Sequence, residues 1–342
     1  HDIENFFRLC YSSGFSQRPD MTMMACCSAL EMACWDIIGK EAGKPVHKLL
    51  GGRVHEGLRS YTYLYPATGS ADPLSTDSPK NVYNDPELAA AAAIEAVRQG
   101  FTAVKFDPAG PYTVFDGRQP SLERLDLSER YTAAIRDAVG NRADLLFGTH
   151  GQFTPSGALR LARRLEAYDP LWFEEPVPPD DLEGMARVAA GTTIPIATGE
   201  RLTTVSEFAA VLRAGAASIL QPDLGRSGGI LQGKKIASVA EVHQALLAPP
   251  CYCGPVVAAA NIALATCSPN FLILESIDTW GGFHADLLET PIRWEDGMVI
   301  PSDRPGLGVV LDEEVARAHP YEGDELHLTP ALEPQPTSED LP

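Results

Sequence analysis

The chain has 342 residues, of which 44% are hydrophobic and 21% charged, and its formal net charge is −19. This length and apolar content allow one large α/β domain, or two domains, with a sizeable core. The negative charge argues against nucleic acid or an anionic membrane as a partner, because such partners select basic patches. The negative charge does not exclude a small anionic substrate, since a bound metal can invert the local electrostatic field.

The seven cysteines indicate free thiols rather than a disulfide framework, because their number is odd and the chain is long. No apolar run reaches the roughly 18 residues of a membrane span, and the first residues do not form a signal peptide. We therefore expect a cytoplasmic protein with no membrane contact. The chain begins with His1 rather than Met, so we expect its natural start to be missing.

The predicted elements begin with a helix over 21–40, where small and apolar residues recur at helical spacing. Short apolar runs then alternate with amphipathic segments. We expect strands at 58–64, 102–106, 144–147, 171–174, 194–198, 218–221, 245–248 and 271–275. We expect helices at 86–99, 125–139, 156–167, 205–214, 230–243 and 256–267. This alternation predicts a closed parallel barrel, with a doubly wound open sheet as the alternative.

Loops rich in Pro and Gly at 66–84 and 107–125 interrupt the alternation. The expected domain boundaries divide the chain into part of a capping domain, the barrel, a segment returning to the cap, and a tail. These are residues 1–57, 58–285, 286–330 and 331–342.

Polar residues follow most of the expected strands, about one strand-plus-helix unit apart, so a barrel would bring them to its C-terminal rim. They are Lys105, Asp107, His150, Glu174, Glu175, Glu200, Asp223 and Glu275. Glu174 and Glu200 are suited to a hard cation such as Mg²⁺. Beside that cation, a Lys or His can move a proton next to a substrate carboxylate.

Five motifs resemble the mandelate racemase branch of the enolase superfamily. They are WDIIGK (35–40), WFEEP (172–176), ATGERL (197–202), QPD (221–223) and PGLG (305–308). The resemblance implies an α/β fold, a modified TIM barrel of (β/α)₇β type with an α+β capping domain whose first strands are missing from this chain. It also implies a homo-oligomer, from dimer to octamer.

The same resemblance assigns roles to individual residues. Glu174 and Glu200 would bind Mg²⁺, or alternatively Mn²⁺, with Glu175 and Arg201 supporting them. The expected catalytic residues are Lys105, His150, Asp223 and Glu275. The expected substrate-binding residues are Asp107, Tyr112, Gln152 and Trp280.

The chain departs from the family pattern at three positions. Gly148 stands where the family has a metal-binding Asp, so His150 or a water would complete the metal site. Pro250 stands where a His is expected, which leaves Asp223 without its partner. Asp107 replaces the second Lys of a Lys-x-Lys motif. These departures disfavour racemisation, which needs two bases.

One-sided chemistry needs one base and one acid, which Lys105 and His150 would supply. FGTHGQFT (147–154) and KFDPAGPY (105–112) resemble the 3,6-anhydro-L-galactonate cycloisomerases. We therefore expect metal-dependent removal of the α-proton of a sugar acid, followed by β-elimination. That is cycloisomerisation of an anhydro-aldonate or dehydration to a 2-keto-3-deoxy acid.

Non-catalytic interpretations stand beside these. Glu174 and Glu200 would form salt bridges, and Lys105 would pair with Asp107 or Glu174. Asp223 and Glu275 would have structural roles. The whole chain would then be a degenerate family member that binds a ligand without turnover. A racemase or epimerase is a further alternative.

Overall fold

The computed structural model describes residues 2–13, 17, 20–64, 82–110 and 115–320. The chain forms two compact units. We call them the central unit, Tyr61–Thr198 with Ala214–Ala217, and the split unit, His1–Ser60 with Gly199–Arg213 and Ser218–Tyr321.

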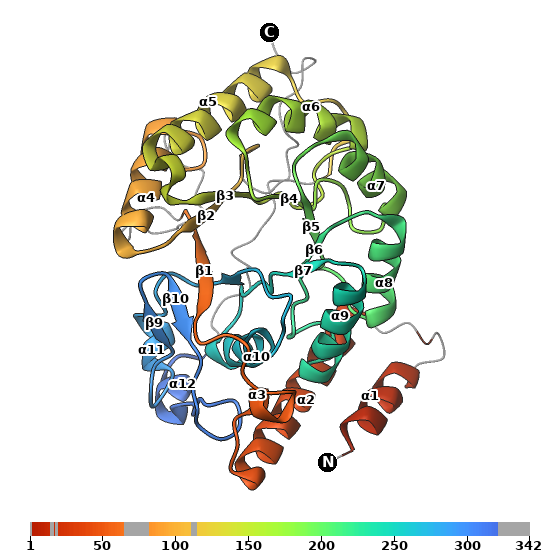
Figure 1. Ribbon diagram of the computed structural model, residues 1–342, viewed down its shortest axis with the longest axis vertical. Coiled ribbons are helices and arrows are strands. Elements are labelled where there is room, and N and C mark those ends of the chain that lie inside the picture. The colour runs from red at the N-terminus through yellow and green to blue at the C-terminus, as the bar shows by residue number, and fades with distance from the viewer. Residues whose placement is uncertain (1, 14–16, 18–19, 65–81, 111–114, 321–342) are drawn as a thin grey trace. The chain divides into compact units, whose positions relative to one another are not determined.

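The central unit alternates strands with helices, and Figure 1 shows the helices on the outer side of the strands. Its strands are the second half of β1 (Leu58–Tyr63), β2 (Ala103–Phe106), β3 (Asp144–Phe147), β4 (Trp172–Glu174) and β5 (Ile196–Thr198). Its helices are α4 (Pro86–Gln99), α5 (Leu122–Val139), α6 (Pro155–Leu165) and α7 (Leu182–Gly191), with the 3₁₀ helices η1 (Gly140–Arg142) and η2 (Glu166–Tyr168).

Neighbouring strands of the central unit run parallel, as the sequence predicts. β2 pairs with β3, β3 with β4 and β4 with β5, for example Phe106 opposite Phe147 and Phe173 opposite Ile196. The strand residues are almost all buried, since helices cover them on one side. Residues that follow β2, β3 and β4 therefore share one edge of this sheet.

Capping residues explain where α4 begins and ends. The Asp85 carboxylate accepts the backbone N–H groups of Glu87 and Leu88, and Pro86 fills the first turn. Gly100 ends the helix with a φ of 117°, in the region that favours glycine. The observed bounds equal the predicted range 86–99.

The split unit holds the remaining elements. Its helices are α1 (Ile3–Ser12), α2 (Met21–Ala42), α3 (Val46–Leu49), α8 (Val205–Ala214), α9 (Ile230–Val242), α10 (Pro255–Thr266), α11 (Phe283–Asp286) and α12 (Glu313–Ala318). Its strands are the first half of β1, β6 (Ile219–Leu220), β7 (Leu246–Leu247), β8 (Leu274–Glu275), β9 (Arg293–Glu295) and β10 (Met298–Ile300). β6 and β7 pair in parallel, whereas β9 and β10 form an antiparallel hairpin.

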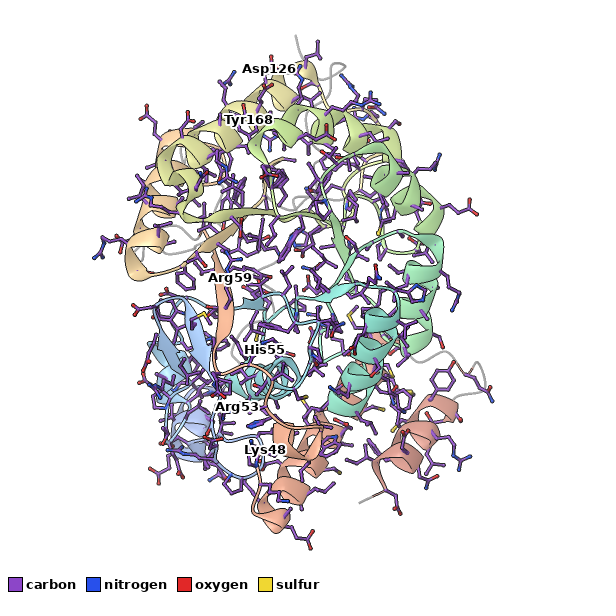
Figure 2. All side chains as sticks on the ribbon, viewed as in Figure 1. Lys48, Arg53, His55, Arg59, Asp126 and Tyr168 are labelled. Atoms are coloured by element: carbon purple, nitrogen blue, oxygen red, sulfur yellow. The ribbon has the colours of Figure 1, made fainter. Side chains whose placement is uncertain are left out.

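Long-range contacts tie the segment after α3 to the rest of the split unit. The Arg53 guanidinium lies 2.6 Å from the Asp303 carboxylate, and His55 Nε2 lies 2.9 Å from the Ser268 carbonyl. Figure 2 labels Arg53 and His55 on this segment. The His55 ring also packs against Phe271.

By length and mean hydropathy, α2 is apolar enough to cross a membrane. This was not predicted from the sequence, because charged residues interrupt the apolar run. The helix nevertheless carries Glu31 and Asp36, whose carboxylates accept backbone N–H groups of Ile230 and Leu307. Such contacts are those of a helix packed within a protein.

Candidate active site

A buried ion pair joins β2 to β4 at one edge of the central sheet. The Lys105 ammonium lies 2.7 Å from each carboxylate oxygen of Glu174, and the two residues are 2% and 1% exposed. The Trp172 indole N–H donates to the same carboxylate at 3.2 Å. This pairing is the non-catalytic alternative considered for Lys105. It also sets an amine beside a carboxylate at the strand ends, where barrel enzymes carry their chemistry.

Asp107 adds a second buried carboxylate to this edge. Its Oδ1 accepts a hydrogen bond of 3.0 Å from the Tyr63 hydroxyl. Burial raises the pKa of Asp107 to about 6, and the charge of Glu174 adds to the rise, whereas His150, the Tyr63 hydrogen bond and Lys105 oppose it. Three other predicted site residues of the central unit, Lys105, His150 and Glu174, therefore act electrostatically on Asp107.

Gly148 directly follows β3, at the position where the resemblance leads one to expect a carboxylate. A Cβ atom there would lie 2.2 Å from the Tyr63 hydroxyl, 2.8 Å from Asp107 Oδ1 and 3.1 Å from Lys105 Cε. Real Cβ atoms essentially never approach other atoms as closely as the first two distances. The space of the missing side chain is thus filled by Tyr63 and Asp107.

The turn that carries His150 is fixed by its neighbours. The Thr149 hydroxyl donates to the backbone carbonyls of Glu174 and Glu175, the latter at 3.1 Å, and the Gly151 N–H donates to the Glu175 carbonyl at 2.8 Å. Glu175 has a φ of 38°, in the left-handed region that costs a non-glycine residue energy. Such strained residues gather at functional sites, which supports the prediction that Glu175 belongs to this one.

In the split unit, Arg226 links two predicted site residues. Its guanidinium lies 3.2 Å from Asp223 Oδ2 and 3.4 Å from Glu200 Oε1, and the Gly225 N–H donates to Asp223 Oδ1 at 2.8 Å. Burial raises the pKa of Asp223 to about 6, against the lowering effects of Arg226 and the Gly225 N–H. Asp223 lacks the expected His, as predicted from Pro250, and pairs with Arg226 instead. An Arg three residues further along the same turn is the signal that would have revealed this pair.

Glu275 and Trp280 are buried in the split unit. Glu275 Oε2 accepts the Cys251 backbone N–H at 2.6 Å, which is the structural role considered for it. Pro250 stands in the expected His slot, and its carbonyl accepts a hydrogen bond from Asn261. Trp280 packs in a hydrophobic cluster with Cys251.

Three further residues were predicted to belong to the site. Gln152 is buried in the central unit, and Arg201 is half-buried in the split unit. Tyr112 lies outside the described residues.

The donor chemistry of the central edge fits a hard divalent cation, because Asp107 and Glu174 bring carboxylate oxygens there. Among the residues that the structure describes, no three His, Cys, Asp or Glu side chains already form a group that would hold a metal ion. The Lys105 ammonium neutralises Glu174 instead.

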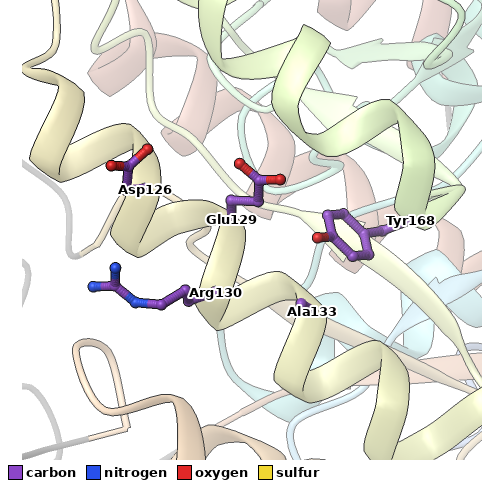
Figure 3. Close-up of a pocket in the computed structure, with 5 residues that line it drawn as sticks. All are labelled: Asp126, Glu129, Arg130, Ala133 and Tyr168. Carbon is purple, nitrogen blue, oxygen red and sulfur yellow. The ribbon is translucent and has the colours of Figure 1, made fainter.

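A cavity of about 330 Å³ lies elsewhere in the central unit (Figure 3). Its lining comes from α5 and η2 and not from strand ends. The lining residues are Asp126, Glu129, Arg130, Ala133 and Tyr168. None was predicted as a site residue, and the cavity does not include the Lys105–Glu174 pair.

Solved structures resemble this chain over nearly its whole length. A mandelate racemase/muconate lactonizing enzyme from Labrenzia alexandrii DFL-11 is 64% identical, with a TM-score of 0.91, covering 96% of this chain and 82% of that one. One from Burkholderia SAR-1 is 62% identical, with a TM-score of 0.91, covering 98% of this chain and 81% of that one. These likenesses confirm the predicted fold class, an α/β modified TIM barrel.

Two named relatives are dehydratases. The D-gluconate dehydratase of Thermoproteus tenax is 32% identical over 327 residues, which are 95% of this chain, and the chain spans 62% of that relative. The D-galactonate dehydratase of Ralstonia nicotianae is 35% identical over 317 residues, which are 91% of this chain and 77% of that relative.

Family models match both parts of the chain. Residues 87–315 match the enolase C-terminal domain-like model, and residues 3–51 match the N-terminal domain of the mandelate racemase/muconate lactonizing enzymes. The first match alone covers more than half of the sequence. The chain therefore belongs to the mandelate racemase/muconate lactonizing enzyme family of the enolase superfamily.

Proposed function

We propose that the chain is a metal-dependent lyase that removes water from a sugar acid. The named relatives are dehydratases of D-gluconate and D-galactonate. The observation that carries the proposal is the buried Lys105–Glu174 pair, with Asp107 close enough to feel the charges of Lys105, Glu174 and His150. An amine, an imidazole and carboxylates at one sheet edge are the groups that proton abstraction beside a carboxylate needs.

The proposed reaction uses one base and one acid. The Lys105 amine, in its neutral form, takes the proton from C2 of the sugar acid, and the electron pair left behind forms an enediolate. When the enediolate collapses, the C3 hydroxyl leaves as water with a proton from His150. The resulting enol takes up at C3 the proton held by Lys105 and loses its C2 hydroxyl proton to His150, which gives a 2-keto-3-deoxy acid and restores both residues, so that water is the only other product.

A divalent cation, when bound, supplies positive charge beside the substrate carboxylate. We propose Mg²⁺, with Mn²⁺ as the alternative, and Glu174 as one of its ligands. The other roles remain predictions from motifs, as do the homo-oligomeric state and the cytoplasmic location. The residues concerned are Gln152, Glu175, Glu200, Arg201, Asp223, Glu275 and Trp280.

Turnover of a panel of sugar acids tests the proposal. D-gluconate, D-galactonate and 3,6-anhydro-L-galactonate are supplied to the full-length protein with Mg²⁺ and then with EDTA. We expect a 2-keto-3-deoxy acid to form from one of them, and EDTA to stop its formation. Lys105→Met should lower kcat by at least about 10²-fold, the usual contribution of a general base. Lys40→Ala, at an exposed lysine of α2, is the control.

Two results would contradict the proposal. One is a Lys105→Met variant that keeps its melting temperature and its full activity. The other is a folded, Mg²⁺-supplied protein that turns over none of the acids, which would favour a family member that binds without turnover. Exchange of the α-proton with solvent, without elimination, would favour the racemase alternative.

A further inference from the structure

Tyr63, the last residue of β1, contacts two predicted site residues at the end of β2: Lys105 lies in the strand and Asp107 follows it. Its hydroxyl donates to Asp107 Oδ1 at 3.0 Å, and the Lys105 ammonium lies 5.1 Å from the centre of its ring. A hydrogen bond to an ionised carboxylate is stronger than a neutral one, and an ammonium within about 6 Å of an aromatic face is attracted to it. One side chain therefore acts on a carboxylate and on an amine.

The position of the Tyr63 hydroxyl depends on residue 148. A Cβ atom at Gly148 would lie 2.2 Å from that hydroxyl and 2.8 Å from Asp107 Oδ1. Because the hydroxyl and Asp107 hold each other, a methyl group there must displace one or both. The absence of a side chain at the end of β3 is thus what lets Tyr63 reach Asp107.

We propose that Tyr63 is a positioning residue for Asp107 and Lys105, and that Gly148 supplies the space its hydroxyl requires. An Asp107 carboxylate held by Tyr63 keeps a fixed position beside Lys105. The contacts are those of the protein itself, whereas their effect on turnover rests on the function proposed above.

A double-mutant cycle in melting temperature tests the spatial part. Gly148→Ala should lower the melting temperature by a few degrees in the parent chain, because overpacking a core is destabilising. The loss should be smaller in a Tyr63→Phe background, since the atom 2.2 Å from the new methyl group is gone. Tyr168→Phe, a hydroxyl at the outer cavity, is the control background and should leave the loss unchanged. Equal losses in all three backgrounds would overturn the proposal.

The kinetics of Tyr63→Phe test the positioning part. If the full-length enzyme turns over a sugar acid, Tyr63→Phe should lower kcat by about tenfold, as the loss of a hydrogen bond to a charged group predicts, and should leave KM nearly unchanged. Tyr168→Phe should change neither constant. A Tyr63→Phe variant with the kcat of the parent chain would overturn the positioning role.

The melting cycle needs no turnover. If it gives the expected result while no sugar acid reacts, the contact of Tyr63 with Asp107 and Gly148 stands and the dehydratase proposal falls. If turnover is found but the melting temperature falls equally in the three backgrounds, the dehydratase proposal stands and the role of Tyr63 falls.

Discussion

The Glu31 carboxylate of α2 accepts the backbone N–H of Ile230, the first residue of α9, at 2.7 Å. It also accepts the N–H of Leu231 at 2.9 Å and the indole N–H of Trp35 at 2.7 Å, and Glu31 is 1% exposed. The first backbone N–H groups of a helix lack partners within it and carry partial positive charge. One buried side chain thus closes the start of another helix, 199 residues further along the chain.

Glu31→Ala should lower the free energy of unfolding by about 2–3 kcal/mol, because two buried N–H groups lose their acceptor. Urea unfolding measures the change. Glu41→Ala, at an exposed position of the same helix, is the matched control. A loss no larger than that of the control would show that α9 does not depend on this cap.

Stability should fall as pH rises from about 4.5 to about 7. Burial raises the pKa of Glu31 from 4.5 to about 7, although its hydrogen bonds to Leu231, Ile230 and Trp35 oppose the rise. The folded chain therefore retains a proton that the unfolded chain has released in this range, and stability declines where the folded state binds more protons.

Unfolding free energies measured at several pH values check this expectation. Glu31→Gln should reduce the slope between pH 4.5 and 7. Asp107 and Asp223, whose pKa values are also raised, contribute with the same sign, so some slope should remain. Identical slopes for parent and variant would show that Glu31 does not titrate in this range.

Arg226→Met should raise the pKa of Asp223 above about 6, because the guanidinium opposes the effect of burial. ¹³C NMR titration of labelled aspartate follows this carboxyl directly. Arg213→Met, at an exposed arginine of α8, is the comparison. If Asp223 titrates at the same pH in Arg226→Met as in the parent chain, the ion pair does not set its proton affinity.

Glu174→Gln should weaken Mn²⁺ binding by at least about tenfold in calorimetry if Glu174 is a metal ligand, since even indirect partners of a metal contribute this much. Glu183→Gln, at an exposed position of α7, should leave binding unchanged. Glu174→Gln also leaves the Lys105 ammonium buried without its counter-charge, so the melting temperature of this variant should fall. Unchanged Mn²⁺ affinity in Glu174→Gln would remove this residue from the metal site.

Local signals predicted much of the fold. The range 86–99 matches α4 because Asp85, Pro86 and Gly100 mark its ends in the sequence itself. The parallel strands of the central unit were predicted from apolar runs, and the ends of those runs correctly located Lys105 and Glu174. Helix α1 (Ile3–Ser12) was not predicted, although Ile3, Phe6, Phe7 and Cys10 recur in it at helical spacing.

Contacts between distant residues were harder to predict. Tyr63 lies 44 residues before Asp107, and its hydroxyl was not considered, because a Tyr at a strand end has no motif of its own. Gly148 was noted only for the carboxylate it lacks. That its empty space is filled by two other side chains follows only from the three-dimensional structure.

The close packing around Gly148 also makes substitutions at positions 63, 107 and 148 depend on one another. A chain that moved its carboxylate from residue 107 to residue 148 would have to shorten Asp107, remove the Tyr63 hydroxyl and enlarge Gly148. If the substitution at Gly148 comes first, the new side chain and the Tyr63 hydroxyl compete for the same space. Variants with a side chain at 148 should therefore be tolerated better in chains that have first lost the Tyr63 hydroxyl, so packing favours one order of change along a lineage.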